Sequence, residues 1–465
     1  MEDLVIKNGL VVTPFGTVRG GLVVRNEKIL QIGADDALPK AKLEIDAQGN
    51  YILPGLIDPH VHIGRAIEED FISQFRTESI SAAISGVTTL MGFVRFGEIL
   101  ERRLRVYQKA KQIGKQNSFI DFKFHAYLFT EEHLEEIPEL IEEGITSAKL
   151  MLNYTEESAR EVGYRAIDFG FVYKVMEILA SYGPPVLVQA HCEQPDIITF
   201  LSNRLKAQGR TDFLAWTESK PGICEAIHAF SLGVISLETG CPVYIVHVSA
   251  KETVDVIRYL KQRGVKIYAE TCPHYLTLTK NTPIGVLARV APPLRDESDV
   301  ERLWQAVADS TFDTIGSDHV PLPRRQKEED GIWKGIPGVG GIGAMLPLLM
   351  TEAVSKGRIT IEQLAKLTSE NPARIWGIYP KKGALSPGSD ADIVIVDPHK
   401  EWVLSAANLK SCSDYSIYEG RAVKGKAIKT FVRGKLVARD GHLVARVPEG
   451  EYVYPLLDVN ARYAN

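Results

Sequence analysis

Between residues 51 and 316, short apolar runs alternate with longer stretches of helical periodicity. Some runs contain almost no charged residues, such as PVYIVHV at residues 242–248, which is typical of strands covered on both faces. The runs end near Asp58, Phe93, Leu128, Leu152, Ala190, Val248, Thr271 and Ser317. Between them, apolar residues recur at three- and four-residue steps, which predicts helices, for example at residues 98–113, 131–143, 164–181 and 252–263. This alternation predicts an α/β protein with a (β/α)8 TIM-type barrel.

Both ends of the chain have the alternating pattern of short antiparallel strands instead. Near the start, the expected turns within residues 3–33 lie at Asn8-Gly9, Gly20-Gly21 and Asn26-Glu27. Near the other end, the expected strands lie at residues 392–396, 429–432 and 435–438. Strands from the two ends are expected to pair into one small, discontinuous β-sandwich beside the barrel.

These patterns set the expected domain bounds. The β-sandwich domain with its C-terminal tail is expected at residues 1–52 and 382–465, and the barrel at residues 53–381. Residues 359–378 have a helical pattern that connects the two. The tail from residue 449 onward is interpreted either as an arm that contacts another subunit or as a frayed end.

Composition and charge narrow the class of protein. The chain has 465 residues, 45% of them hydrophobic, 24% charged, and a net charge of −5. It has no basic block for nucleic acid, and its mild acidity argues against anionic membranes. No apolar run reaches bilayer length, and residues 1–9 place acids where a signal peptide needs lysine or arginine. The five scattered cysteines favour reduced thiols, so we expect a cytoplasmic protein.

Candidate chemistry begins at residues 53–62, LPGLIDPHVH, where His60 and His62 stand two residues apart at a strand end. In an extended chain these two side chains share one face and form a clamp for a divalent metal. Four further candidates stand at or near other strand ends: Lys149, His191, His247 and Asp318. Taken singly, such a histidine is more often a hydrogen-bonded core residue, and such an aspartate a cap or turn residue. Together they fall on the carboxyl-terminal rim, where these barrels place their chemistry.

This ordered set of residues resembles the amidohydrolase superfamily, and within it the cyclic amidohydrolases: hydantoinase, dihydropyrimidinase, allantoinase and dihydroorotase. The resemblance extends over nearly the whole chain. It rests on the segments PGLIDPHVH, SAKLMLNY, VHVS, ETCPHYL, APPLR, GSDH and GSDADIVIVDP. It implies the same barrel with a β-sandwich from both termini, and a homodimer or homotetramer.

The resemblance also implies two divalent metal ions per chain. His60, His62 and Asp318 would bind one ion, His191 and His247 the other, and Lys149 would bridge both. A bridge needs two ligand oxygens, and a lysine that captures carbon dioxide becomes such a ligand, N6-carboxylysine. Zinc is the expected metal, although histidine and carboxylate ligands also suit manganese, cobalt or iron. Asp318 is the expected general base and acid for a hydroxide that bridges the metals.

Three further residues are predicted to contact substrate. Tyr154 follows Lys149 by five residues, where hydantoinases and dihydropyrimidinases place a tyrosine that steadies the oxyanion and where allantoinases generally lack one. The backbones at Ala291 and Gly338 match segments that hold the ring amides in this family. Gly338 replaces the usual asparagine, so at most its backbone contact carries over. Whether His319 orients Asp318, contacts substrate or does neither is left open. His125, His228 and His274 are interpreted as structural.

The predicted reaction is hydrolysis of a hydantoin or dihydropyrimidine ring to an N-carbamoyl amino acid. The alternative is allantoinase, since ETCPHYL, APPLR and the glycine-rich residues 335–349 lean towards allantoinases and L-specific hydantoinases. A dihydroorotase is less favoured because Gly64 stands where that family has an arginine, with Arg65 one place late. A non-catalytic family member is also less favoured, because all six ligands are present. The loops at residues 64–71 and 321–335 are expected to set the ring substituent.

Overall fold

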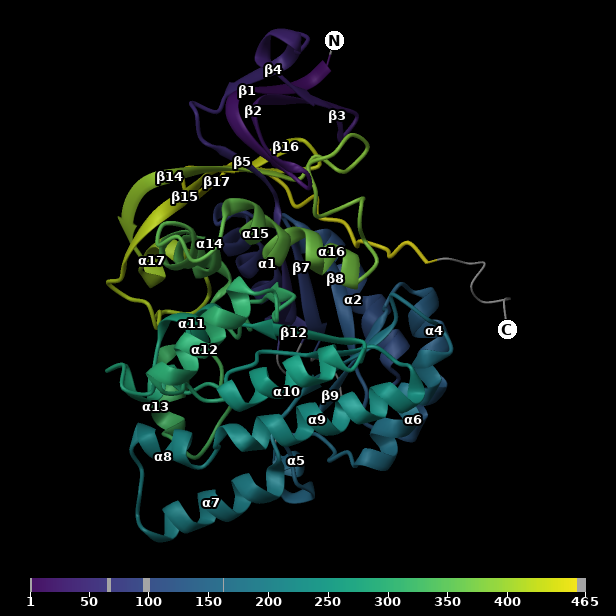
Figure 1. Ribbon diagram of the computed structural model, residues 1–465, viewed down its shortest axis with the longest axis vertical. Helices are drawn as coiled ribbons and strands as arrows, with labels where there is room; N and C mark the ends of the chain where they lie inside the picture. The colour runs from purple at the N-terminus through teal and green to yellow at the C-terminus, as the bar shows by residue number, and fades with distance from the viewer. Residues whose placement is uncertain (1, 65–67, 95–100, 162, 458–465) are drawn as a thin grey trace.

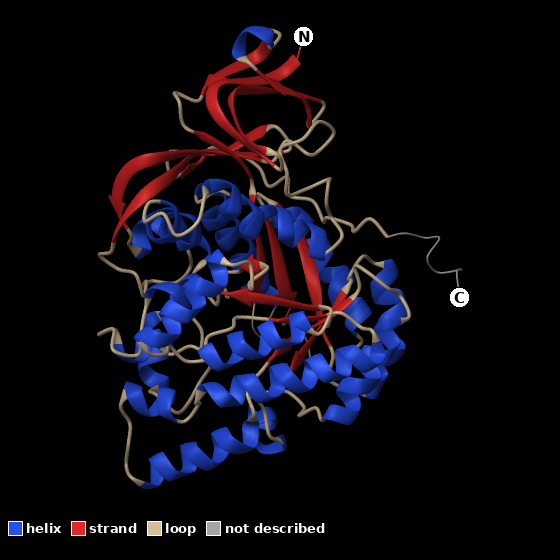
Figure 2. Cartoon of the chain, in the orientation of Figure 1, coloured by secondary structure: helices blue, strands red, loops and turns tan. Residues whose placement is uncertain are grey.

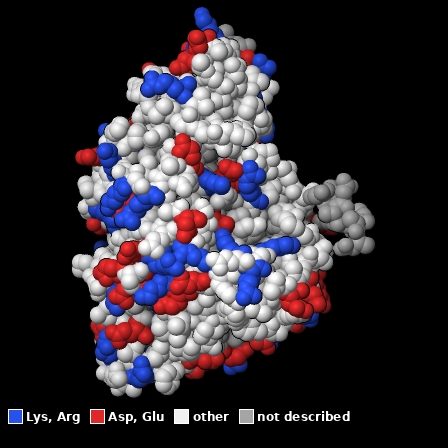
Figure 3. Space-filling view, viewed as in Figure 1, with Lys and Arg blue, Asp and Glu red and all other residues white. Residues whose placement is uncertain are grey.

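The computed structural model describes residues 2–64, 68–94, 101–161 and 163–457. It consists of a barrel wrapped in helices and a β-sheet domain that sits on one end of it (Figure 1). Figure 2 shows the strands of the barrel enclosed by helices, with the separate sheet domain above them. Among the described residues, no helix is both long enough and apolar enough to cross a bilayer. In the space-filling view, acidic and basic side chains are interspersed over the face shown (Figure 3).

The predicted eight-stranded parallel barrel is confirmed. Each strand pairs in parallel with the next, in the order in which they occur in the chain. The strands are β6 (Leu56–Ile63), β7 (Val87–Val94), β8 (Asp121–Tyr127), β9 (Ser147–Met151), β10 (Leu187–His191), β11 (Val243–Ile245), β12 (Ile267–Thr271) and β13 (Thr314–Ile315). The ring is closed by backbone bonds beyond β13, where His62 N donates to His319 O at 2.8 Å and His319 N donates to His60 O at 3.2 Å. Closure therefore brings the HxH segment against the residues around Asp318.

The helices that follow the strands cover the outside of the barrel. They are α1 (Glu68–Ile84), α2 (Arg103–Asn117), α3 (Glu131–Glu135), α4 (Ile137–Glu142), α5 (Glu156–Glu161), α6 (Phe169–Ala180), α7 (Pro195–Ala207), α8 (Phe213–Glu218), α9 (Gly222–Thr239), α10 (Lys251–Gln262), α11 (Pro273–Thr277), α12 (Glu297–Ala308) and α13 (Arg324–Asp330). The chain then continues through α14 (Met345–Leu349), α15 (Ile361–Ala365), α16 (Asn371–Ile375) and α17 (Ala406–Leu409).

Helices are present at all four predicted places, but their bounds differ. The helix predicted at residues 131–143 is divided into the short helices α3 and α4. The helix predicted from residue 164 begins at Phe169, because the Asp168 side chain accepts a bond from Phe171 N at 2.8 Å and caps it. The helix predicted from residue 98 begins at Arg103, and residues 98–100 lie outside the described residues. The helical connection predicted at residues 359–378 is confirmed by α15, α16 and the π-helical turn between them.

The strands from both ends of the chain form one nine-stranded sheet in the order β17-β16-β15-β14-β5-β1-β2-β3, with β4 paired to β1. Its strands are β1 (Glu2–Thr13), β2 (Gly16–Arg25), β3 (Lys28–Gly33), β4 (Ala41–Asp46), β5 (Tyr51–Pro54), β14 (Ile393–Val403), β15 (Ala422–Val432), β16 (Lys435–Arg439) and β17 (His442–Leu443). The antiparallel pairing of β5 with β14 joins the two ends, as expected. A separate hydrophobic cluster from β1, β2, β5, β14 and β15 forms the core of this domain.

Two of the three predicted turns near the start are wrong. Asn8-Gly9 lies inside β1, where the register shifts between Ile6 and Gly9 and forms a bulge with Asn8 at φ 56°. Gly20-Gly21 lies inside β2, where a Cβ on Gly21 would come within 1.9 Å of Ile6 O. These glycines therefore allow close backbone approach rather than a reversal. Asn26-Glu27 is a turn as predicted, with φ of 48° and 66° at its two residues.

The C-terminal tail begins as an ordered segment on the barrel. Phe122 N donates to Glu451 O at 2.9 Å, and Val453 N donates to Phe122 O at 2.8 Å. The Val453 side chain is buried in a cluster with Trp376 at the barrel interior. The first part of the tail is therefore held against β8, while residues 458–465 lie outside the described residues.

Candidate metal centre and substrate pocket

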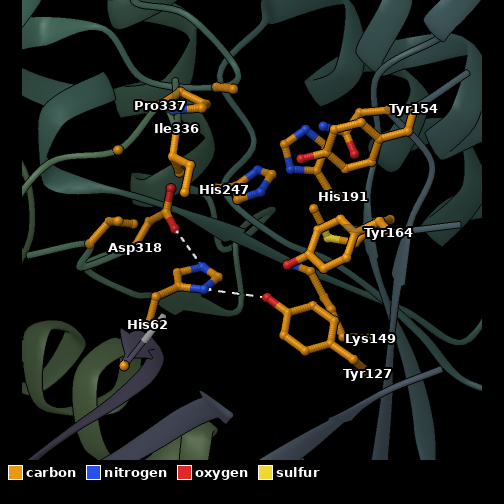
Figure 4. A pocket seen from close by; sticks show the side chains of 16 residues that line it. His62, Tyr127, Lys149, Tyr154, Tyr164, His191, His247, Asp318, Ile336 and Pro337 are labelled. Carbon is orange, nitrogen blue, oxygen red and sulfur yellow. Dashed lines mark hydrogen bonds and ion pairs between the residues drawn. The ribbon is translucent and has the colours of Figure 1, made fainter. Parts of the chain in front are cut away.

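The predicted site residues converge at the carboxyl ends of the barrel strands. One pocket there is lined by His62, Lys149, Tyr154, His191, His247, Ala291, Asp318 and Gly338. His60 is buried directly behind it, with its Nε2 3.2 Å from Asp318 Oδ1. Figure 4 shows these side chains approaching one another from different strands, with His62 between Asp318 and Tyr127. The structure thus brings together all nine residues that the sequence indicated.

His60, His62 and Asp318 form a compact group of ligand atoms. The Nε2 atoms of His60 and His62 are 3.2 Å apart, and each lies 3.2 to 3.3 Å from Asp318 Oδ1. Burial lowers the pKa of His60 well below its usual value, so this imidazole is neutral and able to ligate a metal. Ligand atoms from the three residues lie within 4.8 Å of one another, which fits a shared cation.

Two of the candidate ligands have left-handed backbones, with φ of 40° at His247 and 46° at Asp318. Such a conformation costs a residue other than glycine about 1–3 kcal/mol and persists only where surrounding contacts enforce it. Here His247 N donates to Glu270 Oε1 at 3.0 Å, and Ser317 N donates to the buried Asp58 at 3.0 Å. Buried carboxylates therefore hold both ligands in position.

Lys149 and His247 have buried polar atoms that lack partners. Lys149 is 1% exposed, and among the residues that the structure describes its Nζ has no hydrogen-bond partner. His247 Nδ1 likewise has none within that part of the chain. Burial lowers the pKa of Lys149 to about 8 and that of His247 well below its usual value. Unsatisfied buried nitrogens beside neutral imidazoles fit a group that binds divalent cations, because such atoms are costly to leave without a partner.

Two acidic residues that sequence reasoning missed orient the histidines. Glu270 Oε1 lies 2.7 Å from His60 Nδ1, and Glu193 Oε2 lies 2.8 Å from His191 Nε2. Burial raises the pKa of Glu270 to about 8. For Glu193, burial acts to raise the pKa, but Lys220 and His191 hold it at about 2. In its ionised form, a carboxylate behind an imidazole accepts the ring N–H and fixes the tautomer, which leaves the other ring nitrogen for the site.

The sequence profile of the amidohydrolase family matches residues 51–437. The chain belongs to the amidohydrolase family. It is 31% identical to an L-hydantoinase of Paenarthrobacter aurescens, over 97% of this chain and 98% of the relative. It is 33% identical to a D-hydantoinase of Geobacillus stearothermophilus, over 96% and 95%. A solved L-hydantoinase (dihydropyrimidinase) from Arthrobacter aurescens superposes with a TM-score of 0.91 at 30% identity, over 98% of this chain and all of that one.

The resemblance stated from sequence is therefore confirmed, including the hydantoinase group within the family. The match also confirms the combination of barrel and terminal sheet, since solved hydantoinases share it over nearly the full length. Similarity to both L- and D-hydantoinases shows that overall fold does not separate the two stereochemical preferences. The preference for one enantiomer is therefore expected to depend on the residues that line the pocket.

The pocket of this amidohydrolase has a tyrosine wall. The ring of Tyr154 packs edge-on against Tyr164, with centroids 5.5 Å apart. Tyr127 lies in the same wall and its Oη is 3.4 Å from His62 Nδ1. Ile336 lies across the pocket from these tyrosines (Figure 4), and Val320 also lines the pocket. A ligand in this pocket therefore lies between aromatic and aliphatic side chains.

Hydrogen bonds hold the backbone of Gly338 in the wall of the pocket. Gly338 N donates to Arg289 O at 3.0 Å, and Gly338 O accepts from Lys327 Nζ at 2.8 Å. The Gly338 N–H is therefore already bonded, and the second lone pair of its carbonyl remains for the predicted backbone contact. At φ 144°, a Cβ on this residue would lie 2.5 Å from Val320 Cβ, which leaves no room for a side chain.

The remaining histidines lie away from the pocket. His319 Nε2 is 2.8 Å from the buried Glu78, and its Nδ1 accepts from Gly341 N at 3.0 Å, so it fixes the glycine-rich segment. His125 bonds Ser147 Oγ at 2.6 Å and Pro59 O at 3.0 Å inside the barrel. His228 packs against Phe169, and His274 against Tyr275. None of these four histidines belongs to the described lining of the pocket. Arg65, the arginine considered in the comparison with dihydroorotases, lies outside the described residues.

Proposed function

We propose that this amidohydrolase opens a cyclic amide ring of hydantoin or dihydropyrimidine type and releases an N-carbamoyl amino acid. The supporting observation is the buried Lys149 Nζ, which has no hydrogen-bond partner among the residues that the structure describes and shares one pocket with imidazoles and Asp318. An uncompensated lysine in such a place is unfavourable unless it is converted into a ligand. Full-length relatives named hydantoinase support the same class of substrate.

We propose that Lys149 is carboxylated. With its pKa at about 8, a substantial fraction of the amine is neutral at physiological pH and able to attack carbon dioxide. An N–C bond forms, one proton leaves the nitrogen, and the product carries two oxygens and one negative charge.

Two divalent cations would then be held, one by His60, His62 and Asp318, the other by His191 and His247, with Lys149 shared. Such cations supply activation of a water molecule and polarisation of the scissile carbonyl.

The side chains of the protein have separate tasks in this proposal. Asp318 accepts a proton from the attacking water and donates it to the departing ring nitrogen. The Tyr154 hydroxyl donates to the carbonyl oxygen as negative charge develops there. Among the described residues the backbone N–H and C=O of Ala291 have no protein partner, so they are available to hold a ring amide. The carbonyl of Gly338 supplies the remaining contact.

We also propose the finer assignments that accompany this activity. Zinc is the expected metal, and manganese, cobalt or iron also suit the ligand set. All five cysteines are free thiols, four of them buried, which is typical of a cytoplasmic protein. We expect a homodimer or homotetramer, as the resemblance to this family implied.

The deciding experiment is a panel of rings given to the metal-loaded full chain: hydantoin, 5-substituted hydantoins, dihydrouracil, allantoin and dihydroorotate. Ring opening is followed by loss of ultraviolet absorbance and by detection of the carbamoyl product. We expect turnover of hydantoins or dihydrouracil above the others. Preference for allantoin would favour the second candidate, towards which ETCPHYL, APPLR and the glycine-rich residues 335–349 lean. Failure to open any ring would contradict the proposal.

Tyr154→Phe should lower kcat by roughly 10- to 1000-fold, because one donor to the developing oxyanion is lost. The metal content should stay unchanged, since Tyr154 is not a proposed ligand. Tyr164→Phe is the matched control, because it keeps the edge-on ring pair and removes a neighbouring hydroxyl. Equal losses in both variants, or none in Tyr154→Phe, would remove Tyr154 from the mechanism.

Lys327→Met should raise KM by roughly 3- to 30-fold with kcat less affected. The buried Lys327 ammonium bonds the carbonyls of Arg289 and Gly338. The Arg289 guanidinium in turn bonds the carbonyls of Gly331, Lys334 and Ile336. Without Lys327 this side of the pocket loses its fixed position, and substrate binding weakens first.

Lys334→Met, at an exposed position of the same loop, should leave both constants unchanged. Steady-state kinetics of both variants would test this, and an unaltered KM in Lys327→Met would contradict it.

A further inference from the structure

The connection between β14 and β15 leaves the sheet domain and lies on the barrel. It covers residues 404–421 and contains α17. Four of its apolar side chains are buried in the main hydrophobic cluster together with residues of the barrel: Leu409, Tyr415, Ile417 and Tyr418. At its middle lie residues 411–414, which we call the 411–414 bridge. A part of the sheet domain is therefore built into the packing of the barrel.

The 411–414 bridge accepts two backbone hydrogen bonds from the loop beyond β13. Leu322 N donates to Ser413 Oγ at 3.0 Å, and Arg324 N donates to Asp414 Oδ1 at 2.6 Å. The chain just before these residues contributes Val320 to the lining of the pocket. The bridge therefore fixes the start of the loop that is expected to set the ring substituent.

A buried carboxylate of α1 joins the bridge to His319. Cys412 N donates to Glu78 Oε1 at 2.8 Å, and His319 Nε2 lies 2.8 Å from Glu78 Oε2. On the other side of the ring, His319 Nδ1 accepts from Gly341 N at 3.0 Å. Glu78 and His319 are 0% and 1% exposed. These partners assign the tautomer, because only a neutral ring with its proton on Nε2 both donates to the carboxylate and accepts from the amide.

The backbone of His319 connects the proposed metal ligands. His319 N donates to His60 O at 3.2 Å, and His62 N donates to His319 O at 2.8 Å. Asp318, the residue directly before it, has a left-handed φ of 46°. A conformation of this kind persists only where surrounding contacts enforce it. A displaced His319 would therefore move Asp318 and the HxH segment with it.

We infer that Glu78 and His319 are positioning residues, which fix Asp318 and the glycine-rich wall of the pocket, and that the 411–414 bridge holds them from the sheet domain. The inference rests on the proposed function, in which Asp318 accepts the proton. Val320 N donates to Val339 O at 2.8 Å, which joins the two segments that the pair and the bridge hold. A buried polar pair is weak evidence for stability, because apolar side chains of similar volume often serve as well. What such a pair adds is a fixed orientation, and here it is passed on to residues of the pocket.

The first test separates positioning from stabilisation in the metal-loaded full chain. His319→Leu should lower kcat by roughly 10- to 100-fold, because Asp318 loses its fixed place. It also leaves the Glu78 carboxylate buried without one of its donors, so the melting temperature should fall. Adding Glu78→Gln removes that buried charge and should restore part of the melting temperature, but none of kcat. Recovery of kcat in step with the melting temperature, or no loss of kcat in folded His319→Leu, would overturn the inference.

The second test needs no substrate and examines the bridge. Ser413→Ala combined with Asp414→Ala removes both side-chain acceptors, and amide hydrogen exchange of the full chain is followed by mass spectrometry. We expect exchange at residues 318–324 to be roughly 2- to 10-fold faster. The increase should include Val320 N, which bonds neither of the replaced side chains.

Asp397→Ala is the control for the bridge, because the Asp397 carboxylate accepts from His399 N at 2.9 Å elsewhere in the sheet domain. It should leave exchange at residues 318–324 unchanged. Faster exchange confined to Leu322 and Arg324, or none in the double variant, would refute the role of the bridge.

The exchange measurement also keeps this inference apart from the proposed function. If the unaltered protein opened no ring, that result would count against the proposed function alone. Faster exchange of Val320 N in His319→Leu would still support the positioning role of the pair, because the imidazole does not bond that amide. Unchanged exchange there would refute it.

Discussion

Lys149→Ala is expected to lose its bound metal and more than about a thousandfold in activity. The proposed carbamate would be the one protein ligand shared by both cations, so its loss would remove a contact from each of them. Metal-assisted activation supplies several kcal/mol of transition-state stabilisation, which corresponds to about this factor in rate. Metal analysis should find about two ions per chain in the unaltered protein and far less in the variant. A single ion per unaltered chain would contradict the bridged arrangement.

Chemical rescue separates the carbamate from a purely structural role for Lys149. A short carboxylic acid such as acetate or propionate, added with metal, should occupy the space that Lys149→Ala leaves and restore part of the activity. Lys123→Met is the matched control, because Lys123 is also a fully buried lysine on an adjacent strand, β8, and bonds Gly144 O away from the pocket. It should retain metal and should not respond to acetate. Full activity of Lys149→Ala without rescue would refute the carbamate.

The candidate ligands were predictable because strand periodicity and barrel closure act together. An HxH pair places two imidazoles on one face from local geometry alone, whatever the rest of the fold. Parallel strands end on one rim, so residues at the ends of different strands, such as Lys149 and His191, had to meet there. The resemblance to cyclic amidohydrolases then supplied the proposed bridging role of Lys149, which spacing does not reveal.

The contacts that position these ligands were not predictable in the same way. Glu270 approaches His60 across 210 positions of sequence, and nothing near either residue indicates the pair. The contact between Glu193 and His191 was easier to predict, since Glu193 follows His191 by two residues and shares its face of the chain. The bonded backbone of Gly338 depends on Arg289 and on Lys327, which has no recognisable motif. At Asn8-Gly9 the residue types favour a turn, but β1 continues through them and remains paired with β2 across a bulge.

A second group of buried charges shows how the discontinuous β domain is attached to the barrel. The Lys382 ammonium lies 2.7 Å from Asp392 and 2.9 Å from Asp390, both just before β14. It also contacts Asp121, the first residue of β8, which in turn bonds the Arg433 guanidinium after β15. Lys382 therefore pairs with one acid of barrel strand β8, Asp121, and with two acids that precede β14 of the sheet domain. Arg433 pairs with the same barrel acid, so these charges connect the two domains. Burial acts to raise the pKa of Asp121 and of Asp390, but Lys382 and its neighbours hold both below their ordinary value of 3.8.

Lys382→Met should destabilise the protein by about 3–5 kcal/mol, because it leaves buried carboxylates without their cation. Asp392 is the most affected, since the other hydrogen-bond partner of its side chain among the described residues is the backbone N–H of Arg433. The lowered pKa values of Asp121 and Asp390 contribute stability above pH 3.8 that is lost as the pH falls through their folded pKa. The raised pKa of Lys382 contributes stability below pH 10.5 that is lost as the pH rises beyond it. The effect of the variant should therefore be largest near neutrality and shrink in acid, where the carboxylates become protonated.

Calorimetric and urea unfolding of Lys382→Met at neutral and acidic pH would measure this difference. Arg325→Met is the control, because Arg325 forms an exposed pair with Glu329 one helical turn away and such pairs contribute little. The melting temperature of the control should match the unaltered protein at both pH values. If Lys382→Met were as stable as the control near neutrality, the charge cluster would not be what holds the sheet domain on the barrel. The attachment would then rest on the apolar contacts between the two, and the site at the opposite rim would be independent of these charges.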